Sequence, residues 1–247
     1  MFHRLRTIFW LIPAIAVYTI VLGALSIGSS LFESRGYFAH RCARAWSWLI
    51  LATTGVRVIV TGLERLERGK TYVFVANHQS IYDIPVLFAS IPYQLRIIAK
   101  QSLGSFPFLG WHLRRTGHML VDRQRPEKGR IFDWANTLTS NGLSLIIFPE
   151  GTRSTNGYLG PFKGGLFLLA MQAGLTIVPV SVMGSRHVMR KGELTTRPGE
   201  VRVIVHEPIA TERAEQPDTR AVRALAGRVR EVIRPAVEAE AAADERR

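Results

Sequence analysis

The fold is decided by the stretch YVFVANHQSIYDIPVLFA, which occupies residues 72–89. Residues 72–76 are apolar and rich in β-branched and aromatic side chains, which predicts a short buried strand. A polar turn follows, and an apolar helix is predicted over residues 84–89. A strand, a turn and a helix in this order form the unit from which α/β domains with parallel sheets are built.

The same unit recurs along the chain after residue 55. Further strands are predicted over residues 56–60, 96–99, 119–121, 143–148, 177–182 and 201–206, and further helices over residues 128–141 and 164–173. A final amphipathic helix carries apolar residues from Val222 to Ile233, and Pro235 is expected to end or kink it, leaving residues 236–247 as a solvated tail. The pattern predicts an α/β domain over residues 56–247, with a mainly parallel central sheet flanked by helices.

The N-terminal segment, residues 1–55, has a different composition. No charged side chain occurs from Thr7 to Phe32, and as a helix this stretch is long enough to cross about 30 Å of hydrocarbon. A cleavable signal peptide, with Arg4 and Arg6 as its basic start, is the alternative, although its apolar run is usually only about 7–15 residues. Residues 45–54 are short for a span and predict an interfacial or re-entrant helix, or buried core. We therefore expect residues 1–55 to be a helical, membrane-embedded anchor.

Composition restricts the partners of the chain. Lys and Arg number 32 against 19 Asp and Glu, a net charge of +13, which favours anionic partners such as phospholipid headgroups, phosphorylated metabolites or nucleic acid. The basic residues are dispersed and form no RNA-binding or helix-turn-helix pattern, so a non-catalytic basic membrane- or nucleic-acid-binding protein is the weaker hypothesis. Cys42 is the single cysteine, so no intrachain disulfide forms. No Cys/His cluster has zinc-site spacing, so we expect no metal and no cofactor.

Polar residues directly follow four of the predicted strands. Ligands of open α/β sheets bind at the carboxyl ends of the strands, so parallel strands bring these residues to one edge, and an antiparallel strand sends its residues to the other. They are Asn77 and His78, Lys100, Asp122 and Arg123, and Glu150 to Arg153.

His78 and Asp83 lie five positions apart on the turn after the first of these strands. This spacing allows the carboxylate to accept a hydrogen bond from one imidazole nitrogen while the other nitrogen faces a substrate. A histidine held in this way is a general base, because imidazole takes up a proton near neutral pH. A histidine that only makes a surface hydrogen bond is the alternative that spacing leaves open.

Residues 148–154 read FPEGTRS and follow a strand that is predicted to be buried. Pro149 ends the strand, Gly151 frees the backbone for a close approach, and Arg153 offers a planar fork that suits a phosphate group. A plain turn with a salt bridge between Glu150 and Arg153 is the alternative.

Two further clusters have simpler interpretations. Phe106, Phe108, Leu109 and Trp111 predict core, with a membrane-facing or acyl-chain-lining role as the alternative. Arg186, Arg190 and Lys191 predict a solvated basic face that can also touch anionic lipid. Four further histidines are expected to make ordinary hydrogen bonds rather than to bind a metal; they are His112, His118, His187 and His206.

Taken in order, the motifs resemble those of the glycerolipid acyltransferases, the family of 1-acyl-sn-glycerol-3-phosphate (lysophosphatidic acid) acyltransferases. His78 and Asp83 resemble the HX4D motif of that family, and residues 148–154 are similar to its FPEGTRS motif at every position. Residues 117–123 resemble an intermediate motif, with looser matches at His118 and Met119, and residues 177–180 resemble the final one. The resemblance covers roughly residues 45 to 190.

The resemblance implies a membrane-bound enzyme that transfers a fatty acyl group to the free hydroxyl of lysophosphatidic acid, giving phosphatidic acid. The donor would be acyl-CoA or acyl-carrier protein, and the site would lie on the cytoplasmic side of an inner or cytoplasmic membrane. His78 would be the general base and Asp83 would orient it, without a covalent acyl-enzyme. The implied substrate-binding residues are Glu150, Gly151, Thr152, Arg153, Arg123 and Lys100. Acceptors such as a lyso-ornithine lipid or glycerol 3-phosphate stay open, as do the donor, the acyl-chain length, the number of membrane passes and the oligomeric state.

Overall fold

A computed structural model describes residues 2–33, 35–122 and 128–246 of the chain. Within this part, seven strands form one sheet in the order β1-β7-β6-β2-β5-β3-β4. Every described pair of neighbours is parallel except β6 and β7. The prediction of a mainly parallel sheet is therefore confirmed. The strands are β1 (Val56–Thr61), β2 (Val73–Ala76), β3 (Leu95–Lys100), β4 (Met119–Val121), β5 (Ser144–Ile147), β6 (Ile177–Met183) and β7 (Gly199–Val205).

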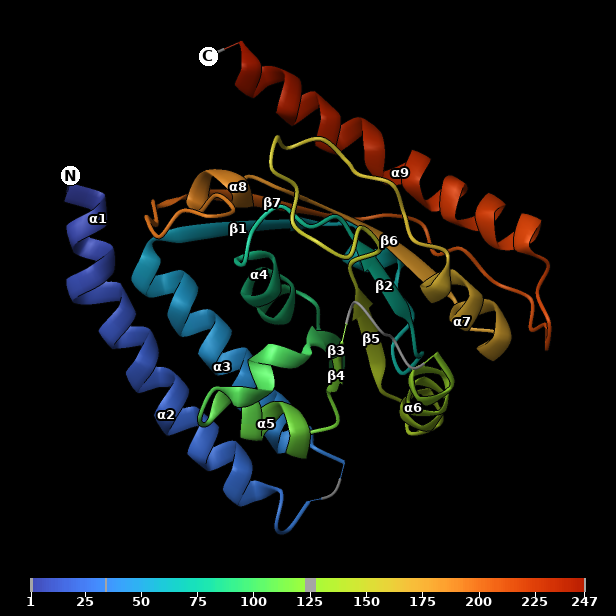
Figure 1. The fold of residues 1–247 in the computed structure, drawn as a ribbon, viewed down its shortest axis with the longest axis horizontal. Coiled ribbons are helices and arrows are strands. Elements are labelled where there is room, and N and C mark those ends of the chain that lie inside the picture. Colours follow the sequence, from blue (N-terminus) through green and yellow to red (C-terminus); the bar gives the residue numbers. More distant parts are fainter. Residues whose placement is uncertain (1, 34, 123–127, 247) are drawn as a thin grey trace.

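Helices cover both faces of the sheet (Figure 1). One face packs against α3 (Tyr37–Thr54), α4 (Asp83–Ser90) and α5 (Leu109–Arg115), and the other against α6 (Lys128–Ser140), α7 (Gly165–Ala173) and α9 (Thr219–Glu245). Because successive strand residues point to opposite faces, Phe74 of β2 belongs to the first core and Val73 to the second. The shorter elements are η2 (Leu63–Arg65), η3 (Gln101–Ser105) and α8 (Ser185–Val188).

Strand direction decides which loops meet. Strands β2 to β6 are mutually parallel, so their carboxyl ends lie along one edge of the sheet. β7 runs against β6, and β1 runs with β7, so these two strands end at the opposite edge. β2 lies between β5 and β6, and the turn after β2 therefore emerges between the loops that follow those two strands.

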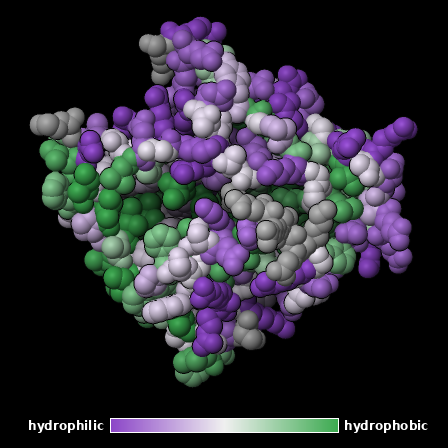
Figure 2. All heavy atoms as spheres, in the orientation of Figure 1, coloured by the Kyte–Doolittle hydropathy of each residue, from purple (hydrophilic) through white to green (hydrophobic). Residues whose placement is uncertain are grey.

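The N-terminal residues form one long helix. α1 (Phe2–Arg6), a π-helical turn η1 (Thr7–Leu11) and α2 (Ile12–Ser29) follow one another without a break. This 28-residue helix is long and apolar enough to cross a membrane, and only 6% of its most apolar window is buried. Figure 2 shows hydrophobic side chains gathered where this helix lies. Its other face packs on α3, where Trp46 Nε1 donates to Thr19 Oγ1 at 2.9 Å.

Residues 45–54 belong to α3, which is amphipathic. Ile50 and Leu51 are buried in the first core, whereas Trp48 on the same helix is 63% exposed. For residues 45–54 the sequence predicts an interfacial or re-entrant helix, or buried core. Buried core describes one face of the helix, and the other face is exposed.

The predicted end of the C-terminal helix at Pro235 is wrong. α9 continues to Glu245 with Pro235 inside it, although proline donates no hydrogen bond to the preceding turn. Val237 and Ala241 beyond the proline are only 1% and 2% exposed, because they extend the apolar stripe that α9 lays on the sheet. Burial of this stripe outweighs the lost backbone hydrogen bond, so residues 236–245 are helix and not a solvated tail.

Candidate active site

The site is built around His78, which follows directly on β2 and Asn77. The Nδ1–H group of His78 donates to Oδ2 of Asp83 at 2.7 Å, the hydrogen bond that the spacing of the two residues allows. The His78 side chain is 10% exposed and that of Asp83 is fully buried. Nε2 of His78 makes no hydrogen bond to the described residues. One imidazole nitrogen is thus held and the other is available.

Asp83 is fixed by the turn that it closes. Its Oδ2 atom also accepts the backbone N–H groups of Gln79 at 2.7 Å and of Ser80 at 2.9 Å. Asp83 is the first residue of α4, where the helix dipole favours a negative charge. These contacts hold the carboxylate in one position, and it in turn fixes the orientation of the His78 ring.

Two further contacts position the turn that carries His78. Asn77 joins β2 to β6, because its Nδ2 donates to Val182 O at 2.8 Å and its Oδ1 accepts from Val182 N at 2.7 Å. The His78 ring stacks on Phe148, with ring centroids 4.1 Å apart and an interplanar angle of 24°. The FPEGTRS loop therefore supplies one wall for the imidazole.

Glu150 connects the two motifs. Its Oε1 accepts the backbone N–H of His78 at 2.7 Å, and its Oε2 accepts the backbone N–H of Gly160 at 3.0 Å. Burial raises the pKa of this carboxyl group, and the two N–H donors act in the opposite direction. Glu150 forms no ion pair with Arg153 in the described part of the chain, so the salt bridge considered for this turn is not what holds it.

The next three residues of the loop are open to solvent to differing degrees. Gly151 has a φ of +71°, a backbone conformation that favours glycine, and a Cβ atom there would lie 2.7 Å from Nζ of Lys163. Thr152 Oγ1 accepts from Lys191 Nζ at 3.1 Å. The guanidinium of Arg153 makes no hydrogen bond or ion pair to the described residues, which leaves it available for an anion.

Two lysines at this loop were not predicted as site residues. Lys191, expected on a solvated basic face, also donates to the carbonyl oxygen of Arg153 at 2.8 Å. Lys163 packs over Gly151. For Lys163, the sequence FKGG at residues 162–165 was the available signal. For Lys191, which is 39 residues from Thr152, no local pattern gives the contact.

The other predicted binding residues lie further along the same edge. Lys100 is exposed at the end of β3, and Asp122 follows β4. The parallel strands therefore bring them to the His78 side of the sheet, but two strands separate β4 from β2. Arg123 lies outside the described residues.

An apolar cavity of about 170 Å³ adjoins the site. It lies between α2, α3, α4 and α5, and Ile81 of the His78–Asp83 turn is part of its wall. Phe108 and Leu109 also line it, whereas Phe106 and Trp111 are 57% and 49% exposed, so the prediction of core is wrong for those two. Trp111 is two positions from both Leu109 and Leu113, which line the cavity, so it lies on the opposite face of α5, and Phe106 lies in the turn between η3 and α5.

His112, His118 and His206 make the ordinary hydrogen bonds predicted for them. His112 bonds to Ser26 at 2.6 Å, and His118 accepts from the backbone of Ile97 at 3.1 Å. Burial lowers the pKa of His112 to about 4. Residues 2–33, 35–122 and 128–246 contain no group of three His, Cys, Asp or Glu side chains that could hold a metal ion.

The mainly parallel sheet and a His–Asp pair held against a second loop define the class of protein: an α/β enzyme domain with a histidine at the carboxyl edge of its strands. A family model described as "Acyltransferase" matches residues 57–183. The chain therefore belongs to the acyltransferase family, as its motifs predict.

Named relatives and a solved structure are similar over most of the chain. A chloroplastic 1-acyl-sn-glycerol-3-phosphate acyltransferase of Arabidopsis thaliana is 34% identical over 219 residues, 86% of this chain and 61% of the relative. The human 1-acyl-sn-glycerol-3-phosphate acyltransferase alpha is 35% identical over 71% of this chain and 62% of the relative. The chain thus spans about three fifths of the length of either relative. The crystal structure of the Thermotoga maritima 1-acyl-sn-glycerophosphate acyltransferase, PlsC, is 26% identical with a TM-score of 0.73, and the match covers 91% of this chain and 93% of that one.

Proposed function

We propose that this protein transfers a fatty acyl group from an acyl thioester to the free hydroxyl of lysophosphatidic acid, giving phosphatidic acid. The observation that carries the proposal is the hydrogen bond between His78 and Asp83, which leaves Nε2 available at the carboxyl edge of the sheet. The relatives named as 1-acyl-sn-glycerol-3-phosphate acyltransferases support this substrate class.

His78 acts as the general base in this proposal. Nε2 takes the proton of the lysolipid hydroxyl, and the oxygen attacks the thioester carbonyl. The tetrahedral intermediate collapses and the C–S bond breaks. The thiolate that leaves then accepts the proton from the His78 imidazolium. Asp83 stabilises the imidazolium that forms between these steps, and no acyl-enzyme is needed.

The loop after β5 supplies the acceptor site. Arg153, whose guanidinium has no partner among the described residues, binds the phosphate of the lysolipid together with Lys163. Lys100 at the end of β3 extends this basic edge, and Arg123, which lies outside the described residues, is proposed as a further phosphate contact on the resemblance alone. Glu150, which the resemblance implies as a substrate contact, has a second role in this proposal, because its two carboxylate oxygens accept the backbone N–H groups of His78 and Gly160. It positions His78.

The apolar cavity beside Ile81 holds part of the acyl chain. Its walls come from the N-terminal helices as well as from α4 and α5, so the anchor and the catalytic domain build it together. A chain that leaves the bilayer along α2 reaches this cavity through apolar surface. This arrangement supports residues 1–55 as the membrane anchor and an active site at the bilayer surface. We further propose, on the resemblance alone, that this surface is the cytoplasmic one.

An assay of the purified protein in detergent micelles tests the proposal. Lysophosphatidic acid, a lyso-ornithine lipid and glycerol 3-phosphate are each offered with palmitoyl-CoA and with palmitoyl-carrier protein, and the acylated product is identified by mass. We expect phosphatidic acid from lysophosphatidic acid with at least one donor. If only another acceptor is acylated, the proposed acceptor is wrong and the proposed acyl transfer stands. If no pair of acceptor and donor leads to consumption of the thioester, the proposal is contradicted.

A further inference from the structure

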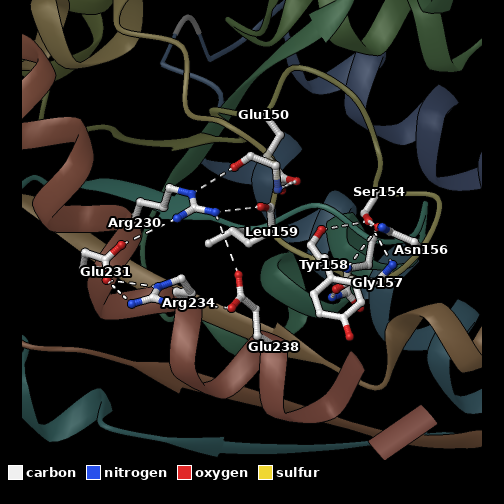
Figure 3. A network of polar contacts seen from close by, with 12 residues as sticks. Glu150, Ser154, Asn156, Gly157, Tyr158, Leu159, Arg230, Glu231, Arg234 and Glu238 are labelled. Atoms are coloured by element: carbon white, nitrogen blue, oxygen red, sulfur yellow. Dashed lines mark hydrogen bonds and ion pairs between the residues drawn. The ribbon is translucent and has the colours of Figure 1, made fainter. Parts of the chain in front are cut away.

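The C-terminal helix reaches the active-site loop through one arginine. Arg230 of α9 donates from Nη2 to Leu159 O at 3.0 Å and from Nε to Gly160 O at 3.3 Å (Figure 3). These two carbonyl groups are adjacent in the chain, and the planar guanidinium can meet both at once. Arg230 lies beyond residues 57–183, the part of the chain that the family model matches.

The carboxylates of α9 hold Arg230 in place. Arg230 lies 3.6 Å from Glu231 and 3.9 Å from Glu238, and Arg234 pairs with the same two carboxylates (Figure 3). Its side chain is 30% exposed. An arginine that is partly buried and flanked by two carboxylates loses much of its rotamer freedom, so its contacts to the loop are well defined.

A continuous chain of hydrogen bonds leads from this arginine to the proposed base. Gly160, whose carbonyl Arg230 holds, donates its N–H to Glu150 Oε2, and Glu150 Oε1 accepts the N–H of His78. The loop returns to His78 a second time, because Ser154 N donates to His78 O at 2.8 Å. The backbone on both sides of the His78 side chain thus depends on the course of residues 154–160.

We propose that Arg230 is a positioning residue for the His78 site: it holds the Leu159–Gly160 carbonyls so that Gly160 fixes Glu150 and Glu150 fixes the backbone of His78. The inference rests on the proposed function, since it assigns Arg230 to the active state of that site. Arg230 touches no substrate and acts only through the loop.

A purely structural role makes a different prediction. In that case Arg230 only docks α9 on the domain, as Glu245 does through its 2.9 Å hydrogen bond from Tyr158 OH. Tyr158→Phe breaks a contact between α9 and the same loop that is not on the path to Glu150. It is therefore the matched control for docking, and Arg228→Ala, at an exposed position on the same helix, is the control for charge.

The test compares kcat, the KM of each substrate and the thermal midpoint for Arg230→Ala, Arg230→Lys and the two controls, with lysophosphatidic acid and palmitoyl-CoA or palmitoyl-carrier protein. We expect Arg230→Ala to lower kcat about tenfold with the KM of the thioester unchanged within twofold. Arg230→Lys keeps one donor toward the carbonyls, so its kcat should lie within about threefold of the wild-type kcat. Tyr158→Phe and Arg228→Ala should stay within twofold of wild type, even where the midpoint of Tyr158→Phe falls.

Several outcomes overturn the inference. A kcat of Arg230→Ala equal to that of Tyr158→Phe overturns it. A folded Arg230→Lys variant with a kcat as low as that of Arg230→Ala also overturns it. If Arg230→Ala does not fold, Arg230→Met, which keeps the apolar stem and removes the donors, takes its place, and a folded Arg230→Met variant with the kcat of Tyr158→Phe also overturns the inference. His78→Ala run in parallel separates the two proposals: full activity there contradicts the proposed function as well, whereas an inactive His78→Ala beside a fully active Arg230→Ala contradicts the role of Arg230 alone.

Discussion

The backbone N–H of His78 donates to Oε1 of Glu150 at 2.7 Å, although the two residues are 72 positions apart in the sequence. This bond joins the turn after β2 to the loop after β5. It exists because β2 and β5 are parallel neighbours, so their carboxyl ends lie side by side. The two motifs that the sequence shows separately therefore form one site.

Glu150→Gln tests this connection. An amide can accept one of the two N–H groups, but its NH₂ end then faces the other donor. We expect kcat to fall about 10- to 100-fold with little change in the KM of the thioester, measured as the initial rate of phosphatidic acid formation. Glu64→Gln, at an exposed position, is the control. A Glu150→Gln variant as active as this control would show that the carboxylate is not needed to hold His78.

Asp83→Asn tests the orientation of the imidazole. The side-chain amide carries no charge to stabilise the imidazolium, and its oxygen accepts the three N–H donors that converge on Oδ2 more weakly than the carboxylate does. We expect the rate to fall at least about 10²-fold while substrate binding persists. Asp133→Asn, on the exposed side of α6, removes the same charge as a control. Equal rates for the two variants would remove Asp83 from the mechanism.

Gly23→Leu tests the acyl-chain cavity. Gly23 lines the cavity, and a Cβ atom there would approach Phe108 Cβ to 3.0 Å, so a leucine side chain must occupy the space that we assign to the lipid. We expect the ratio of kcat/KM for a 16-carbon thioester to that for a 10-carbon thioester to fall at least about tenfold. The ratio is measured within one variant, so partial loss of folded protein leaves it unchanged. Gly28→Leu, where an added Cβ meets no atom within 4 Å, should keep the wild-type ratio. An unchanged ratio in Gly23→Leu would place the chain elsewhere.

Glu240→Gln tests a pH effect at the end of α9. Burial raises the pKa of Glu240 to about 7. The folded state therefore binds this proton more tightly than the unfolded chain. The stabilisation is complete below the ordinary value of 4.5 and is lost as the pH rises through about 7. We expect Glu240→Gln to be more stable than wild type by about 1 kcal/mol at pH 8, an estimate reduced for the partial exposure of the group, and nearly equal to it at pH 4.5.

Thermal midpoints in detergent at the two pH values measure this difference. Glu212→Gln, at an exposed position, is the control for the loss of a carboxylate. A Glu240→Gln variant that loses stability equally at both pH values would mean that the carboxylate itself is needed there.

Local patterns in the sequence predict much of the fold and part of the site. The strand at residues 119–121 and the His78–Asp83 hydrogen bond are both short-range features, and the structure has both. The continuation of α9 beyond Pro235 could not be predicted in this way. It depends on the burial of Val237 and Ala241 against residues far away in the sequence, which local propensity does not contain.

Long-range contacts explain the rest of what was missed. Lys191 reaches Thr152 over 39 residues, and Arg230 reaches Gly160 over 70. Neither spacing belongs to a helix or strand period, so no motif gives these contacts. The same holds for β7, whose alternation predicts a strand but not its direction, which is set by its pairing with β6 and β1.

The most direct test of the account is the initial rate of phosphatidic acid formation by His78→Ala, beside His187→Ala as a matched control on the exposed end of α8. We predict a loss of about 10³-fold for His78→Ala, the size expected for removal of a general base, with the control at wild-type rate and both proteins folded. A His78→Ala protein that keeps more than a tenth of the wild-type rate would contradict the proposed chemistry.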